Sequence, residues 1–154
     1  MLPARVRPLA RRAALLPALA LLPALAVLLA ACAVTESPPP TSEGSIGAPV
    51  LLTVGITHAG SVSGTAGQTE SYYAFVAKAG GGMHTISLFN NAQDVAWDLY
   101  DNASFSTLLT ACDNGTGSSN EICTTSSPLT GGQSYYLKVH NRSSIGTLYY
   151  LTVD

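Results

Sequence analysis

Two runs of residues near the C-terminus constrain the fold most strongly, because each alternates apolar and polar side chains. The runs are QSYYLKVH at 133–140 and TLYYLTV at 147–153. A period of two places one side of a run against a core and the other towards solvent, as in a half-buried β-strand. Tyr135, Leu137 and Val139 share one face of the first run. This region of the chain is therefore predicted to lie in β-sheet.

Further short runs with strand-forming residues precede these two, and turn residues such as Gly, Asn, Asp and Ser separate them. They cover 51–56, 60–64, 70–76, 84–88, 95–100, 107–111 and 121–125. About eight short strands at this spacing predict an antiparallel β-sandwich or jelly-roll domain. Residues 141–146 are predicted to join the last two strands as a hairpin loop.

The first 31 residues are typical of a secretion signal. An uncharged stretch at 13–31 follows four basic residues, Arg5, Arg7, Arg11 and Arg12. Nineteen uncharged residues could nearly span a bilayer, so an uncleaved membrane helix and an ordinary signal peptide are the alternatives. Pro17 and Pro23 interrupt a helix there, and the stretch ends in small residues, which favours cleavage.

The end of this stretch, Leu29-Ala30-Ala31-Cys32, resembles the lipobox of bacterial lipoproteins. The resemblance implies cleavage before Cys32, which would carry a diacylglycerol and an N-acyl chain. Two or more acyl chains give stable membrane anchoring. The expected location is the cell envelope. Ala33 stands where an Asp would retain a Gram-negative lipoprotein at the inner membrane, so the resemblance implies the outer membrane in such a cell.

The residues after Cys32 are poor in large apolar side chains and include three successive prolines, 38–40. Such a segment cannot bury enough apolar surface to offset the entropy of ordering it. The predicted organisation is a signal peptide over 1–31, the lipidated cysteine and a flexible, disordered linker over 32–49, and a folded domain over 50–154.

The distribution of charge excludes one class of partner. Four of the seven basic residues precede Cys32, and all nine acidic residues follow it. The chain from Cys32 onward therefore has three basic and nine acidic side chains, a formal net charge of −6. Such a surface repels nucleic acid, and no nucleic-acid partner is expected.

Five runs of the folded region, in their order and spacing, resemble the bacterial pre-peptidase C-terminal domain, a small β-sandwich. They are GSVSG at 60–64, ESYYAF at 70–75, WDLY at 97–100, YYLKV at 135–139 and YYLTV at 149–153. Members of that family usually follow a secreted peptidase domain, and some relatives bind calcium or collagen. This chain departs from the pattern at Ala96, where an acidic residue often precedes Asp98 by two positions. No peptidase sequence accompanies the domain here.

Cys112 and Cys123 are the two cysteines of the folded region. An exported protein meets an oxidising environment, which favours a disulfide between them. The bond would close a ring of twelve residues and stabilise the domain by about 2.5–3 kcal/mol in the chain-entropy model. A metal-binding pair and two free thiols are the alternatives.

Several acidic residues in and beside predicted turns offer oxygen ligands for calcium. They are Asp94, Asp98, Asp101, Asp113 and Glu121. Their spacing matches neither an EF-hand nor a repeat-toxin pattern. Asp is also common in turns because its side chain bonds the local backbone, so turn chemistry explains these positions equally well.

Catalysis is not predicted. The three histidines have no metal-ligand spacing, and no nucleophile motif such as GxSxG is present. The chain is therefore expected to be a non-enzyme without a cofactor.

The tyrosine doublets suggest a binding surface, because one ring of each doublet should face outward. The candidates for a ligand platform are Tyr72, Tyr73, Tyr136 and Tyr150. Outward aromatic rings can contact sugars or peptides. The favoured function is a lipid-anchored, non-catalytic binding module for a polysaccharide or an envelope protein. The alternative is a structural or assembly accessory for a separately encoded secreted peptidase or envelope complex.

Overall fold

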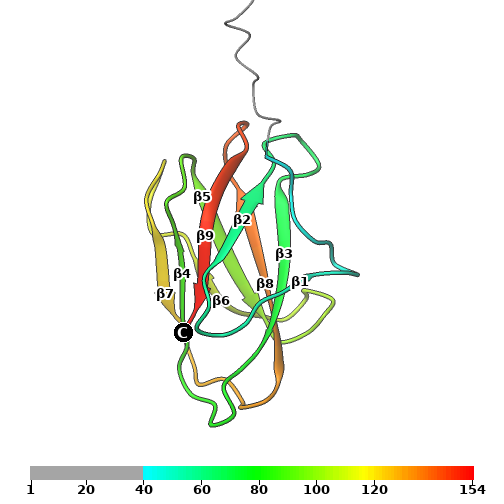
Figure 1. Ribbon diagram of the computed structural model, residues 1–154, viewed down its shortest axis with the longest axis vertical. Coiled ribbons are helices and arrows are strands. Elements are labelled where there is room, and N and C mark those ends of the chain that lie inside the picture. Colours follow the sequence, from blue (N-terminus) through cyan, green and yellow to red (C-terminus); the bar gives the residue numbers. More distant parts are fainter. Residues whose placement is uncertain (1–39) are drawn as a thin grey trace, which may run out of the picture. The chain divides into compact units, whose positions relative to one another are not determined.

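Two β-sheets pack face to face in the computed structural model of the chain, which describes residues 40–154 (Figure 1). One sheet has five strands in the order β1-β3-β8-β5-β6, and the other has four in the order β2-β9-β4-β7. The strands are β1 Val50–Leu51, β2 His58–Val62, β3 Glu70–Val76, β4 Thr85–Phe89, β5 Val95–Tyr100, β6 Leu108–Cys112, β7 Glu121–Thr124, β8 Ser134–Asn141 and β9 Thr147–Val153. All pairs are antiparallel except β1 with β3. The predicted β-sandwich is confirmed.

The core consists mainly of the alternate residues that each strand turns inward, as the period of two in the sequence predicts. Tyr135, Leu137 and Val139 of β8 face inward, as do the alternate residues of β9, and all are buried. They pack around Trp97 of β5, which is fully buried. Each such large apolar side chain contributes about 1.5–3 kcal/mol when it leaves water.

The predicted hairpin between the last two strands is wrong. β8 pairs with β3 and β5, whereas β9 pairs with β2 and β4 in the other sheet. Residues 142–146 therefore cross from one sheet to the other. Alternation specifies which face of a strand is buried, but both inner faces of a sandwich are buried alike, so it does not specify the neighbouring strand. Within residues 40–154, β5 and β6 are the one pair of consecutive strands that are neighbours in a sheet.

The predicted disulfide is confirmed. Cys112 at the end of β6 bonds Cys123 in β7, with 6.0 Å between the two Cα atoms. Because β6 and β7 are edge strands of different sheets, the disulfide joins the two layers along one flank of the sandwich.

The opposite flank is closed by residues 40–45, here called the strap. The backbone N–H of Tyr72 in β3 donates to the carbonyl of Glu43 (2.8 Å), and the hydroxyl of Ser61 in β2 donates to the carbonyl of Thr41 (2.8 Å). The prediction of a flexible linker over 32–49 is therefore wrong for the strap, residues 40–45. It rested on the scarcity of apolar side chains, but hydrogen bonds to both sheets hold this segment.

The signal segment, Cys32 and the linker up to residue 39 lie outside the described residues. Within residues 40–154, no helix is long and apolar enough to cross a membrane.

Candidate ligand-binding face

The outer face of the five-stranded sheet gathers aromatic and charged side chains. The register of β3, β8 and β5 places Lys138 opposite both Tyr72 and Asp98, and Tyr136 opposite Tyr100. We call this surface the aromatic face. Its residues are Glu70, Tyr72, Asp98, Tyr100, Phe105, Tyr136, Lys138 and His140.

Phe105, from the loop between β5 and β6, covers three of the tyrosines. Its ring centroid lies 5.0 Å from that of Tyr72, 5.4 Å from Tyr100 and 5.7 Å from Tyr136, each edge to face. The side chain of Asn102 shapes this loop by accepting a hydrogen bond from the backbone N–H of residue 106 (3.1 Å). Phe105 has a backbone φ of 52°. Residues other than glycine rarely adopt this conformation, and it is frequent at functional sites.

Lys138 is the cation at the centre of the face. Its Nζ lies 3.4 Å from Glu70 Oε1, 3.6 Å from Asp98 Oδ2 and 5.7 Å from the ring centroid of Tyr100. Burial opposes the ammonium charge, but Tyr100 and the two carboxylates outweigh it, so the pKa of Lys138 is raised. Burial and then the hydrogen bond to Glu70 raise the pKa of Tyr72 to about 12. Lys138 and Glu70, whose pKa is lowered, are therefore charged at neutral pH, and Tyr72 is neutral.

His140 lies beside the cluster of Lys138, Glu70 and Asp98, at one end of the aromatic face. Its Nε2 lies 3.5 Å from Asp98 Oδ2, and this buried nitrogen makes no hydrogen bond. Burial lowers the pKa of His140 more than Asp98 raises it. The imidazole is therefore neutral at neutral pH.

The other end of the face is a shallow apolar hollow of about 430 Å³. Leu51 of β1 and Val76 of β3 line it and are largely exposed, and Tyr136 connects it to the aromatic cluster. The face therefore runs from a charged end, through stacked rings, to an apolar end.

Only two members of the predicted tyrosine platform share this face, Tyr72 and Tyr136. Tyr73 is fully buried between the sheets, because β3 alternates and Tyr72 takes the outward position. Tyr150 lies in the other sheet, on its exposed side next to Phe89, with ring centroids 5.7 Å apart. The predicted four-residue platform is therefore wrong.

Five residues of the face were not predicted as site residues: Glu70, Tyr100, Phe105, Lys138 and His140. The sequence signal for Phe105 is a single large ring inside a loop of small polar residues, 101–107. The cross-strand position of Lys138 needed the register of three strands, which the sequence does not provide.

The five acids proposed for calcium lie in different settings: Asp94, Asp98, Asp101, Asp113 and Glu121. Asp98 belongs to the aromatic face. Asp113 Oδ2 pairs with the Arg142 guanidinium at 2.8 Å. Glu121 is buried and accepts a hydrogen bond from the backbone N–H of Asn114. Among residues 40–154, no three His, Cys, Asp or Glu side chains are grouped so that they could hold a metal ion.

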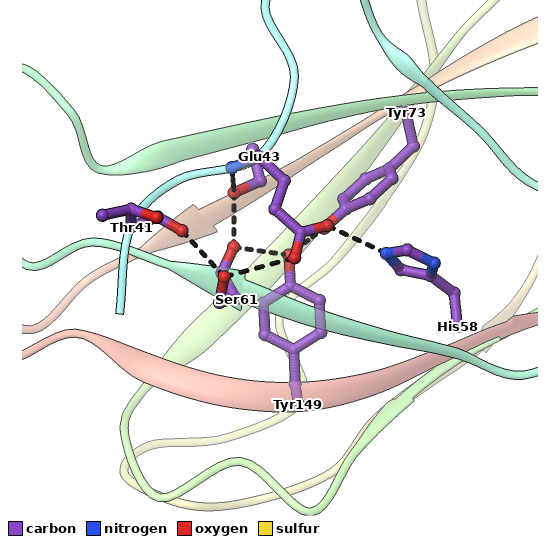
Figure 2. A network of polar contacts seen from close by, with 7 residues as sticks. Thr41, Glu43, His58, Ser61, Tyr73 and Tyr149 are labelled. Carbon is purple, nitrogen blue, oxygen red and sulfur yellow. Dashed lines mark hydrogen bonds and ion pairs between the residues drawn. The ribbon is translucent and has the colours of Figure 1, made fainter. Parts of the chain in front are cut away.

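A second polar cluster surrounds Glu43 of the strap, and Figure 2 shows it. Glu43 Oε2 accepts hydrogen bonds from His58 Nε2 (2.8 Å) and the Tyr73 hydroxyl (3.2 Å), and Oε1 accepts one from the Ser61 hydroxyl (3.2 Å). The Tyr73 hydroxyl also lies 2.6 Å from that of Tyr149. His58 bonds the carboxylate rather than Ser61, so the cluster does not form the base and nucleophile pair of a hydrolase.

No protein-family model and no curated protein matches the sequence. Among solved structures, the pre-peptidase C-terminal domain of a collagenase from Bacillus anthracis is similar, with a TM-score of 0.53 and 18% identity over 69% of this chain and 94% of that one. PliG, a periplasmic inhibitor of g-type lysozyme from Aeromonas hydrophila, matches with a TM-score of 0.43 and 14% identity over 69% of this chain and 96% of that one. The first likeness shows that this chain has a fold like that of the pre-peptidase C-terminal domain.

Proposed function

We propose that the chain is a non-catalytic binding module, held in the cell envelope by lipid on Cys32, and that its aromatic face binds a segment of an envelope protein. One observation carries the proposal. A ring cluster under the strained Phe105 connects a charged group to an apolar hollow along a single sheet face.

The order of these three regions favours a polypeptide over a polysaccharide. The hollow beside Leu51 and Val76 offers apolar contact that suits an aliphatic side chain. Lys138 and Asp98 offer both signs of charge at the other end. The rings are already in edge-to-face contact with Phe105, which leaves less ring surface free for stacking against a sugar. Protein interfaces also favour Tyr and Phe at their centres.

The binding test is a capture experiment in which the immobilised protein is exposed to envelope protein extract and, separately, to purified envelope polysaccharide, each with and without calcium. Phe105→Ala removes the covering ring, and Phe89→Ala is the matched control on the other sheet. We expect a protein to be retained by wild type and Phe89→Ala and lost with Phe105→Ala. Retention of polysaccharide alone would mean that the ligand is a polysaccharide and not a protein. No retention of either would contradict the binding function and favour an accessory structural role.

The anchoring test uses the substitution Cys32→Ser. We expect wild type to stay with the membrane through an alkaline carbonate wash and Cys32→Ser to be released, because two or more acyl chains are needed for stable attachment. A Cys32→Ser protein that still sediments with washed membranes would contradict the lipid anchor.

A further inference from the structure

The chain reaches the sandwich at one end, between two loops. The first residues of the strap lie against residues 63–69, where Ser42 Oγ accepts a hydrogen bond from the backbone N–H of Ser63 (3.2 Å). They also lie against the loop between β8 and β9, because a Cβ atom at Gly146 would come within 3.2 Å of the Pro40 carbonyl oxygen. We call this region, made of residues 40–42, 63–69 and 143–148, the exit end.

The strap fixes this point of entry. Beyond the bonds of Thr41 and Ser42, the backbone N–H of Glu43 donates to Ser71 Oγ (2.9 Å), and its carboxylate binds His58 (2.8 Å). The polar cluster in Figure 2 therefore ties the strap to β2 and β3 at several points.

The length of chain before the strap limits how the domain can turn. Pro40 lies eight residues after Cys32, and this length of chain reaches at most about 26–29 Å when fully extended. Strand β8 also has eight residues, so the tether is about as long as the sandwich is tall. The end opposite the exit end could touch the membrane only if the tether were stretched along the whole side of the domain.

The surface chemistry of the exit end suits lipid headgroups. Residues 40–42, 63–69 and 143–148 contain no charged side chain and several hydroxyl groups, and Ile145 at the loop between β8 and β9 is 61% exposed. The nearest charged residues flank it in the sequence: Glu43, which bonds His58, Glu70, which pairs with Lys138, and Arg142, which pairs with Asp113. In a chain with an acidic excess, an uncharged surface meets anionic headgroups with the least repulsion.

We propose that the exit end faces the membrane and rests on its lipid headgroups, with Ile145 in contact, so that the aromatic face stands sideways to the bilayer. The inference rests on the proposed lipid anchor. It adds the orientation of the domain, which the anchor alone leaves undetermined.

The test places a tryptophan at either end of the full-length lipidated protein in vesicles of phosphatidylethanolamine and phosphatidylglycerol with brominated acyl chains. Ile145→Trp probes the exit end, and Met83→Trp is the matched control. Met83 is half exposed and follows the turn after β3, away from the exit end. Trp97, the one native tryptophan, is fully buried and gives a common background. Ser144→Trp, at another exposed position of the loop, replaces Ile145→Trp if that variant folds poorly.

We expect Ile145→Trp to lose emission to the bromines and shift to the blue, whereas Met83→Trp emits as in unbrominated vesicles. Flotation of the vesicles distinguishes a wrong orientation from a missing lipid anchor. Protein that floats but shows equal quenching at both positions, or none, overturns the orientation and leaves the anchor intact. Protein that does not float overturns the anchor and the orientation with it.

Discussion

The hydroxyl groups of Tyr73 and Tyr149 lie 2.6 Å apart, although the two residues belong to different sheets. Tyr73 also reaches Glu43 of the strap (3.2 Å) and Tyr149 the Ser61 carbonyl oxygen (3.3 Å), so either hydroxyl can be the donor in the pair. Burial is the main reason that the pKa values of both phenols are raised far above their ordinary range. Both are therefore neutral, and they join the two sheets and the strap at one buried point.

Removal of one of these hydroxyls should destabilise the domain. Tyr149→Phe removes one hydrogen-bond partner of the buried Tyr73 hydroxyl, and we expect a loss of about 1–2 kcal/mol in the free energy of unfolding. Urea denaturation measures this loss. Tyr150→Phe is the matched control, since that residue is 41% exposed, and it should unfold at the wild-type urea concentration. Equal midpoints for both variants would show that the buried pair contributes nothing.

Gly60 is required by the same pair. A Cβ atom there would lie 2.5 Å from Tyr149 Cε2 and 2.8 Å from the Tyr73 hydroxyl, and both rings are held in the core. We expect Gly60→Ala to cost about 1–3 kcal/mol, the usual penalty for overpacking, seen as a lower melting temperature. Gly47→Ala, where a Cβ would meet nothing within 4 Å, should melt close to wild type. A Gly60→Ala protein as stable as Gly47→Ala would mean that the rings can move.

Reduction of the disulfide should lower stability without unfolding the domain. The ring closed by Cys112 and Cys123 predicts a loss of about 2.5–3 kcal/mol, because the reduced chain has more freedom when unfolded. Melting curves of the oxidised and reduced protein measure it. Two free thiols titrated in the untreated native domain, together with unchanged melting on reduction, would contradict the bond.

Glu121 should give stability an unusual dependence on pH. Burial, then Asp113 and Asp94, raise the pKa of this carboxyl above its ordinary 4.5 against the hydrogen bond from Asn114. The folded protein therefore holds its proton more tightly than the unfolded chain. The stability from this group is complete below about pH 4.5 and is lost as the pH rises through the raised pKa. In urea titrations, the stability of wild type relative to Glu121→Gln should fall as the pH rises above 4.5.

Glu70 provides a control of opposite sign. Burial opposes its charge, but the hydrogen bond from Tyr72 and the charge of Lys138 prevail and lower its pKa. The stability that the Glu70 carboxylate contributes to the fold is present above about pH 4.5 and is lost as the pH falls through the lowered pKa. Wild type should therefore lose stability relative to Glu70→Gln as the pH falls below 4.5. If both variants changed in the same direction, the assignment for Glu121 would be wrong.

The sequence predicted the strands well because alternation is a local property. The predicted run at 70–76 coincides with β3, and that at 95–100 with β5. Pairing was not predictable in the same way. The loop after His140 looks like a hairpin because its composition is that of a turn, and nothing in its residues specifies whether it stays in one sheet.

The candidate site was predicted only partially, for the same reason. Alternation indicates that one tyrosine of each doublet faces outward, but not which one, so Tyr73 was included wrongly. Phe105 reaches the face from a loop, and a loop has no alternation of apolar and polar residues from which the direction of a side chain could be predicted. The strap was missed because one carboxylate and main-chain groups hold it, and apolar composition does not reveal such contacts.

The two flanks of the sandwich differ in how they would carry force. The disulfide closes one flank covalently, whereas the strap closes the other with hydrogen bonds and continues into the N-terminal chain. A pull on that chain therefore acts first on the strap, whose hydrogen bonds can break in succession. Residues 40–49, once released, could extend over at most about 33–36 Å, and the chain would lengthen by part of this before load reached β1 and β3. With the proposed lipid anchor, the strap would act as a mechanical buffer between the anchor and the core.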